Sequence, residues 1–99
     1  LADAVVHVLQ LENPPNLINA GTGVDHTIRE IAEMVKATVG FEGAIETDPS
    51  KPDGAPRKLM DVSLLKEQGW TSKIPLKQGI EMTYKLFLEE LGKGNLRER

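Results

Sequence analysis

Proline and glycine interrupt this sequence so often that most regular elements must be short. The 99 residues contain six prolines and nine glycines. Proline has no backbone donor and restricts the residue before it, and glycine commonly ends a helix. Asn13-Pro14-Pro15, the Gly21-Thr22-Gly23 turn and the loop 48–56, which holds three of the prolines, therefore divide the chain into short segments. We expect several short elements with one longer helix near the C-terminal end.

Two helices are expected in the first half of the chain. Leu1 to Leu11 carries apolar residues at spacings of three and four, which is the period of a helix. The second helix begins with Thr27-Ile28-Arg29-Glu30, a capping-box sequence in which the Thr and Glu side chains bind backbone amides reciprocally. Gly40 is a natural residue to end it.

Two more helices are expected in the second half. A short one is capped by Asp61 or Ser63 and ends at Gly69, and Trp70 is placed to pack back on it. A long one starts at Pro75, which the first helical turn tolerates. Its end is expected at Gly92-Lys93-Gly94, and its apolar stripe consists of Leu76, Ile80, Tyr84, Phe87, Leu88 and Leu91.

Short strands are expected between the helices, at residues 16–20, 43–47 and less clearly 58–62. The resulting order α-β-α-β-(β)-α-α predicts a small α/β fold. Two or three short strands make a poor sheet alone, so we expect this chain to be a piece of a larger protein. The start at Leu1, without Met and without a helix cap before it, favours the same interpretation.

Composition excludes several functional classes. The net charge of −3 gives no basic surface for nucleic acid, and no apolar run reaches the ~20 residues that a membrane span needs. The absence of cysteine excludes disulfides, thiolate zinc sites and a cysteine nucleophile. It is consistent with a cytoplasmic location. The two histidines, His7 and His26, lack the spaced ligand partners of a metal site and are expected on polar helix surface and near a helix start.

The segment Gly21-Thr22-Gly23-Val24-Asp25-His26 lies between an expected strand and an expected helix. That position suggests a dinucleotide-binding loop, but the fingerprint needs a third Gly or Ala where His26 stands. A tight turn that leads into a capped helix is the favoured interpretation, and we assign no cofactor-binding residue here.

The loop from Lys51 to Lys58 is the most informative segment. It combines three cations, Lys51, Arg57 and Lys58, with one carboxylate, Asp53, on a backbone stiffened by prolines. Arginine offers a planar fork to phosphate oxygens and lysine a flexible point charge, while a carboxylate accepts from ribose or sugar hydroxyls. The loop therefore suits a nucleoside diphosphate. The alternative is a solvated charged loop in a chain of which 27% is charged.

Two long strings resemble the GDP-L-fucose synthase family of extended short-chain dehydrogenase/reductases. They are Asn19 to Glu30, with Gly-Thr-Gly-Val-Asp-His-Thr-Ile-Arg-Glu, and Ser50 to Val62, with Lys-Pro-Asp-Gly-Ala-Pro-Arg-Lys-Leu-Met-Asp. The run from Leu65 to Trp70 and the later Thr83-Tyr84 and Phe87-Leu88 pairs continue the likeness. It covers nearly the whole chain, and the Lys-Pro-Asp-Gly…Pro-Arg-Lys string is its most specific part.

The resemblance implies an enzyme in two parts. An N-terminal Rossmann part binds NADP(H), and a C-terminal part holds GDP-4-keto-6-deoxy-mannose, which is epimerised at two carbons and then reduced to GDP-L-fucose. Residues 1–94 are expected to be the sugar-nucleotide-binding part, and 95–99 a frayed tail. By the same resemblance, Arg57 and Lys58 face the diphosphate and Asp53 the nucleotide, with weaker support for Lys51.

The family's catalytic groups are missing from this sequence. The resemblance implies a Ser and a Tyr-x-x-x-Lys pair, but the only tyrosine, Tyr84, is followed four residues later by Leu88. We therefore assign no catalytic residue, and expect the 99-residue chain alone to be inactive and to bind GDP-sugars weakly or not at all. Two alternatives stay open: a self-associating interaction module, and a fragment of another nucleotide-sugar epimerase or dehydratase. Homo-oligomerisation is expected.

Overall fold

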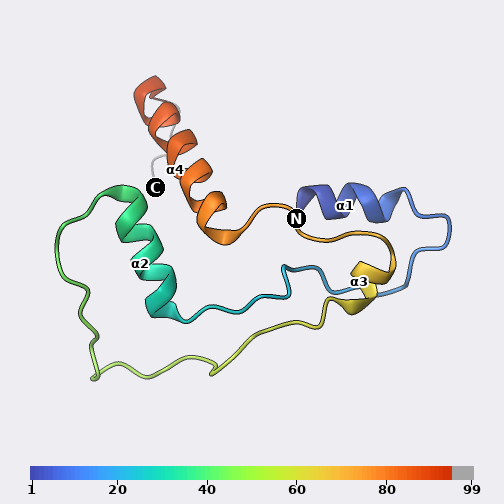
Figure 1. The fold of residues 1–99 in the computed structure, drawn as a ribbon, viewed down its shortest axis with the longest axis horizontal. Coiled ribbons are helices and arrows are strands. Elements are labelled where there is room, and N and C mark those ends of the chain that lie inside the picture. Colours follow the sequence, from blue (N-terminus) through green and yellow to red (C-terminus); the bar gives the residue numbers. More distant parts are fainter. Residues whose placement is uncertain (95–99) are drawn as a thin grey trace. The chain divides into compact units, whose positions relative to one another are not determined.

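The computed structural model describes residues 1–94, which contain four helices (Figure 1). Within this range the chain divides into two compact units. The first unit comprises Leu1–Asp25 and Ser50–Lys73, and the second comprises His26–Pro49 and the chain from Ile74 onward. The helices are α1 (Ala2–Leu9), α2 (Ile28–Val39), α3 (Ser63–Glu67) and α4 (Leu76–Lys93). All four coincide with helices expected from the sequence.

The first unit is built around a small aliphatic and aromatic core between α1 and α3. Ala4, Leu65 and Trp70 are its buried members. Val8, Ile18 and Ala20 pack against them. The Trp70 amide donates to the Leu65 carbonyl at 3.2 Å, so the chain folds back after Gly69 as the sequence predicted. A core of three buried residues leaves the unit sensitive to any change in them.

Polar side chains of α1 attach it to the segment that follows α3. The Trp70 indole Nε1 donates to Asp3 Oδ2 at 2.9 Å, and Lys73 Nζ lies 3.2 Å from the same oxygen. His7 Nε2 is 2.7 Å from the Gln68 carbonyl oxygen. His7 is therefore half-buried and engaged in tertiary contact, whereas the sequence placed it on a polar helix surface.

The second unit contains α2 and α4, which pack against one another. Helix α2 has the predicted capping box: the Glu30 amide donates to Thr27 Oγ1 at 3.0 Å, and the Thr27 amide donates to Glu30 Oε2 at 3.3 Å. Gly40 ends it in the left-handed conformation, with φ of 76°. Because both signals are local, the sequence located both ends of this helix.

Helix α4 is the longest, with 18 residues. Pro75 occupies its N-cap and Gly94 its left-handed C-cap, so the expected start and end are confirmed. The rings of Tyr84 and Phe87 stack with centroids 6.5 Å apart. No residue of the helix is fully buried, although Ile80 and Tyr84 are half-buried.

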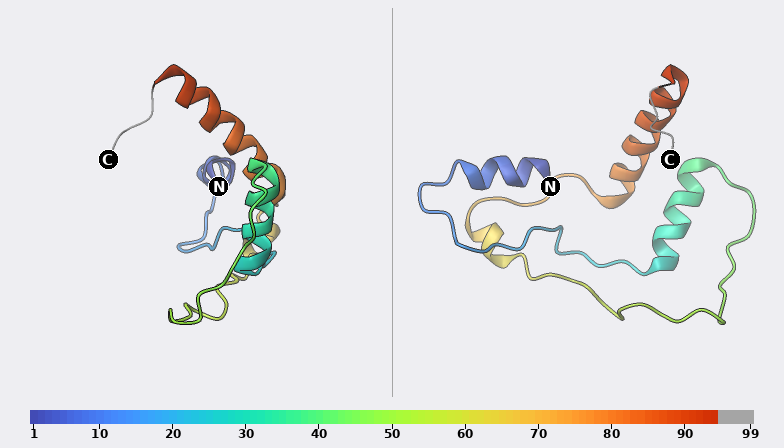
Figure 2. Two further views of the ribbon diagram at one scale, coloured as in Figure 1. Left: turned by 90° about the vertical axis from the view of Figure 1, so that its left-hand side faces the viewer. Right: turned by 180° about the vertical axis from the view of Figure 1, so that it is seen from behind.

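The predicted strands are wrong for the part of the chain that the structure describes. Residues 16–20, 43–47 and 58–62 are extended coil and turns, and neither Figure 1 nor the two further views of Figure 2 contain an arrow. Residue types that favour strands are not enough to form one, because a β-strand needs backbone hydrogen bonds to an adjacent strand. None of these three segments pairs with another. The fold of residues 1–94 is therefore helical with long connections, and the α/β assignment needs this correction.

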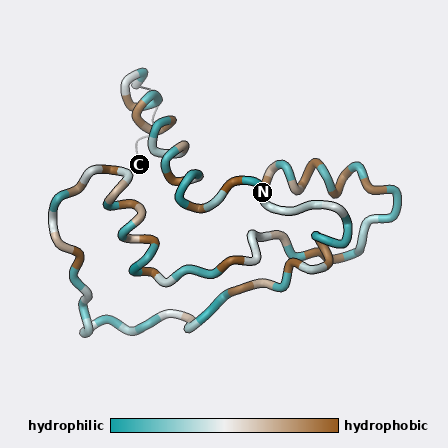
Figure 3. The backbone as a smooth tube through the Cα atoms, viewed as in Figure 1, coloured by the Kyte–Doolittle hydropathy of each residue, from teal (hydrophilic) through white to brown (hydrophobic). Residues whose placement is uncertain are grey.

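Apolar side chains remain exposed on every long helix. Figure 3 shows hydrophobic positions recurring along α1, α2 and α4 between hydrophilic ones. The exposed large residues of these helices are Val5, Val6, Leu9, Ile28, Val35, Val39, Leu76, Met82, Leu86, Phe87, Leu88 and Leu91. None of the helices in residues 1–94 combines the length and apolarity needed to cross a membrane.

The contacts of Asp3 predict a pH-dependent stability of the first unit. The pKa of Asp3 is lowered, first by the hydrogen bond from the Trp70 indole and then by Lys73. A carboxyl whose pKa is lower in the folded state stabilises the fold above its unfolded pKa of about 3.9, and this contribution is lost as pH falls through the folded value. Replacing Asp3→Asn should therefore lower stability at neutral pH and have no effect in strong acid.

Urea unfolding followed by Trp70 fluorescence at several pH values measures this difference, since Trp70 is the only tryptophan. Glu12→Gln is the matched control, because Glu12 is an exposed carboxylate in the same unit. A wild-type-to-Asp3→Asn difference that stays constant from neutral to acid pH would show that ionised Asp3 contributes nothing.

Candidate functional site

All four residues that the sequence singled out lie in the first unit, on the loop that precedes α3. Lys51, Asp53, Arg57 and Lys58 are exposed. Among residues 1–94, no hydrogen bond or ion pair joins Lys51 or Asp53 to Arg57 or Lys58. Arg57 and Lys58, in contrast, lie against another part of the unit, and they carry the candidate site.

Arg57 joins the loop to the glycine turn. Its Nε donates to Asp25 Oδ2 across 32 residues of sequence, forming an ion pair. Asp25 is the last residue of Gly21-Thr22-Gly23-Val24-Asp25, which we call the glycine turn. The sequence treated the turn and the loop as separate features, so this pairing was missed. Opposite charge was the only signal for it, and charge does not identify a partner so far away in sequence.

Lys58 lines a small cavity together with the glycine turn. The cavity is about 160 Å³ in volume, and its other walls are Leu59, Met60 and Val62. The two strings that carry the family resemblance therefore meet here, with a cation of the loop on one side and turn backbone on the other. Arg57 is held beside this cavity through Asp25, which lines it. The charged groups of its lining are one ammonium, that of Lys58, and one carboxylate, that of Asp25, whose charge is paired with Arg57.

Gly23, the second glycine of the turn, is explained by backbone conformation and packing rather than by a dinucleotide. Gly23 has φ of 76°, and a Cβ there would lie 2.9 Å from Val62 Cγ2. The Thr22 hydroxyl closes the turn on the backbone of Val24, 3.2 Å from both its amide and its carbonyl. A side chain at position 23 is thus excluded by the backbone and by Val62, with no ligand involved.

The helix after the turn also fails to fit a dinucleotide. A pyrophosphate binds to free amides at a helix N-terminus. In α2 the Thr27 and Glu30 amides are already bound within the capping box, and the Glu30 carboxylate stands at that end. A carboxylate repels phosphate. The glycine turn and the start of α2 therefore do not form the phosphate site that NADP(H) would need.

No metal centre is formed by the described residues: nowhere in 1–94 do three or more His, Asp or Glu side chains gather closely enough to hold an ion. His26 Nδ1 lies 3.4 Å from Glu30 Oε2 near the start of α2, in the position that the sequence predicted. The carboxylate next to His26 is thus the one that caps α2.

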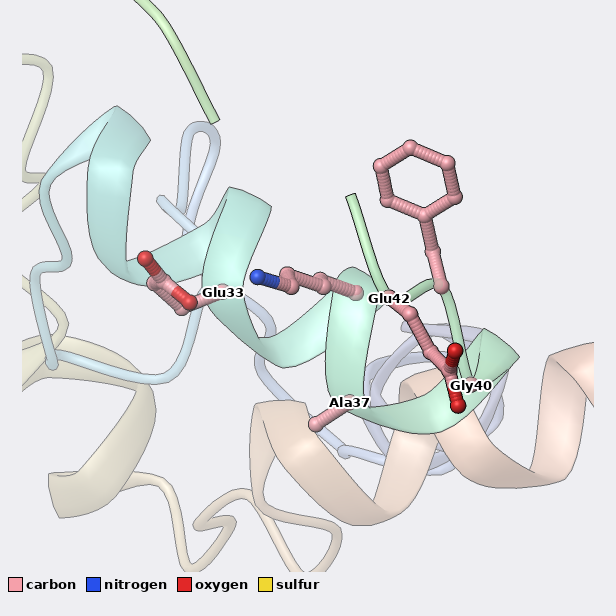
Figure 4. A pocket seen from close by; sticks show the side chains of 6 residues that line it. Glu33, Ala37, Gly40 and Glu42 are labelled. Atoms are coloured by element: carbon pink, nitrogen blue, oxygen red, sulfur yellow. The ribbon is translucent and has the colours of Figure 1, made fainter. Parts of the chain in front are cut away.

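A second cavity, of about 340 Å³, lies at the C-terminal end of α2 in the second unit. Figure 4 shows Glu33 and Ala37 on successive turns of the helix, with Gly40 and Glu42 at its end. Lys36 and Phe41 complete the lining. Two carboxylates and one ammonium group give this surface no strong preference for an anion, and it contains none of the predicted site residues.

Comparison with known proteins shows which proteins this chain is similar to. The chain is 48% identical over 91 residues to the probable GDP-L-fucose synthase 1 of Oryza sativa subsp. japonica, covering 92% of this chain and 28% of the relative. It is 46% identical over 98 residues to the GDP-L-fucose synthase of Escherichia coli, covering 90% of this chain and 30% of the relative. This chain is homologous to part of the GDP-L-fucose synthases. No family model matches it.

A solved structure supports the same homology. The chain aligns with a GDP-6-OMe-4-keto-L-xylo-heptose reductase from C. jejuni at a TM-score of 0.79 and 36% identity, covering 90% of this chain and 28% of that one. The chain thus spans less than a third of the length of the relatives it matches. The resemblance seen in the sequence is confirmed.

Proposed function

We propose that this chain is the GDP-binding part of a GDP-L-fucose synthase-like enzyme, which epimerises and reduces GDP-4-keto-6-deoxy-mannose. The observation that carries this proposal is that Lys58 lines one small cavity together with the glycine turn, while Arg57 pairs with Asp25 of the same turn. Arg57 and Lys58 supply two positive charges for a diphosphate, and the carboxylate of Asp25, which is paired with Arg57, offsets one of them.

The names of the relatives support the nucleotide part most directly. The GDP-L-fucose synthases and the GDP-heptose reductase are named for different sugars, but GDP is common to both. A segment that matches all of them is expected to serve the shared part of the ligand. We therefore assign Arg57 and Lys58 to the diphosphate. Asp53 is assigned to nucleotide hydroxyls, and Lys51 to a peripheral contact.

The chemistry of the proposed reaction needs groups that this chain does not supply. NADP(H) provides hydride in such a reduction, and the glycine turn and the capped α2 do not fit it. We propose that the cofactor and the proton-transfer residues belong to another part of the full-length enzyme. The role of this chain is then to bind and orient the sugar nucleotide, and inactivity of the 99-residue chain alone stays a prediction.

A nucleotide panel tests the proposal. A chimera in which this chain replaces the matched segment of the Escherichia coli GDP-L-fucose synthase, here called the chimera, places these residues in a complete relative. We expect calorimetric titration to show GDP and GDP-sugars binding at least tenfold more tightly than UDP- and dTDP-sugars, equivalent to about 1.4 kcal/mol. The unmodified Escherichia coli protein is the control. Equal binding of all three nucleotide classes by the chimera alone would contradict the assignment to GDP.

The exposed apolar residues favour a second candidate function, self-association. Large apolar patches on a folded protein mark interaction surfaces, and symmetric dimers are the most common closed assembly. Helix α1 and its N-cap Leu1 expose Leu1, Val5 and Leu9 at helical spacing. We expect the isolated chain to dimerise, and light scattering across a tenfold dilution series measures this. A constant monomer mass at the highest concentration would rule out dimerisation. The net charge of −3 opposes association, because two copies repel each other.

A further inference from the structure

The hydrogen bond between Arg57 and Asp25 uses one nitrogen atom of the guanidinium. The hydrogen bond runs from Nε to Asp25 Oδ2. An arginine side chain has five N–H donors in a planar fork, of which Nε carries one and the two terminal nitrogens carry four. Among residues 1–94 no other hydrogen bond or ion pair of Arg57 is found. The terminal donors are therefore left for another acceptor.

Burial of the two partners is unequal. The Arg57 side chain is 65% exposed and that of Asp25 is 35% exposed. Asp25 also lies in the glycine turn, whose backbone is held by the Thr22 hydroxyl, 3.2 Å from the Val24 carbonyl oxygen, and by the left-handed conformation of Gly23. Asp25 is thus the anchored member of the pair, and Arg57 is the member that it holds. An exposed arginine without such a partner samples many rotamers. Ligand binding restricts it to a few of them, and this loss of side-chain entropy weakens binding.

We propose that Asp25 is a positioning residue, which fixes Arg57 through Nε so that its terminal nitrogens receive the diphosphate of the nucleotide. This inference rests on the proposed function. It adds a residue that is not expected to touch the ligand, and it gives the glycine turn a role: the turn holds the carboxylate that orients the arginine. Lys58, on the cavity wall, completes the cationic side of the site.

Asp25 could instead compete with the nucleotide for Arg57, and this role predicts the opposite change in nucleotide affinity when Asp25 is removed. If Asp25 acted as a competitor that occupies Arg57 until phosphate displaces it, removing the carboxylate would strengthen nucleotide binding. If it positions Arg57, removing it weakens binding, because the arginine must then be ordered by the ligand. The sign of the change in affinity therefore separates the two roles.

The experiment is a double-mutant cycle in the chimera, with GDP and guanosine as probes. We expect Asp25→Ala to weaken GDP binding about fivefold to tenfold, which is the range for ordering one long side chain at the moment of binding. Guanosine, which has no phosphate, should bind equally to both proteins. In an Arg57→Ala background, Asp25→Ala should cause no further loss. Asp25→Asn serves as the isosteric variant if Asp25→Ala does not fold, and Glu12→Gln is the matched control for loss of a carboxylate.

A spectroscopic measurement on the 99-residue chain tests the contact itself. The Arg57 Nε–Hε resonance, assigned with Arg57→Lys, should shift and exchange faster with water when Asp25 becomes Asn. Tighter GDP binding in Asp25→Ala, or an equal loss with and without Arg57, overturns the positioning role while the proposed function stands. Unchanged GDP affinity in Arg57→Ala alone overturns both, because the site itself would then be misassigned.

Discussion

Replacing Arg57 and Lys58 together by alanine in the chimera is expected to weaken GDP-sugar binding by about 2–4 kcal/mol, roughly 30- to 800-fold. Each hydrogen bond to a charged group contributes about 1.5–3 kcal/mol, and the sum is reduced here because both side chains are exposed. Calorimetric titration with GDP, compared between the chimera and its double variant, measures the effect.

The control must remove the same charge from a different place. Lys77 and Lys85 are exposed on α4 in the second unit, so Lys77→Ala with Lys85→Ala lowers the net charge by the same amount outside the proposed site. We expect this control to change GDP affinity by less than about twofold, since screened surface charges contribute little. Equal losses in the two double variants would mean that only overall charge matters, and the loop would then be ordinary solvated surface.

The single variants separate shape from charge. Arg57→Lys keeps the charge but loses the fork that allows Nε to bind Asp25 while the terminal nitrogens bind phosphate. A loss in Arg57→Lys nearly as large as in Arg57→Ala is therefore expected if Arg57 acts through its geometry.

The helices could be predicted because their signals are local. Thr27 and Glu30 are three residues apart, and Gly40 follows the last helical residue directly. Both ends of α2 can therefore be predicted from residues close together in the sequence. The cap of α3 was less certain: Asp61 Oδ1 accepts from the Ser63 amide at 2.9 Å, while the N-cap position is Val62, which makes no side-chain cap. The sequence therefore identified the Asp61 side chain as a capping group, but it did not identify Val62 as the N-cap residue.

The strands could not be predicted reliably, because a strand depends on a partner that local sequence does not specify. Residues 43–47 contain Ala44, Ile45 and Thr47, which suit a strand, yet in the structure they are unpaired coil. The site shows the same limit. Lys51, Asp53, Arg57 and Lys58 were found from residue type and resemblance, and whether they bind ligand stays a prediction. Asp25 was found only when the fold brought it to Arg57.

Shortening Leu65→Ala is expected to destabilise the first unit by about 2–5 kcal/mol, the range for truncating a buried leucine. Leu65 is 1% exposed and is the largest fully buried side chain of the described residues. Its truncation leaves a cavity in the cluster that it forms with Ala4 and Trp70, the only other buried residues in the described part of the chain. A loss of this size is comparable with the whole stability of a small domain, so the unit should unfold at much lower urea concentration. Trp70 fluorescence reports the transition directly.

Leu64→Ala is the matched control, because it makes the same chemical change in the adjacent residue of the same short helix. Leu64 is 37% exposed. Its truncation therefore removes fewer contacts and opens no closed cavity, and we expect a loss of less than about 1 kcal/mol. The intrinsic helix propensity change is identical in the two variants, so the difference between them isolates core packing. Equal urea midpoints for Leu64→Ala and Leu65→Ala would show that the cluster of Ala4, Leu65 and Trp70 does not hold this unit together.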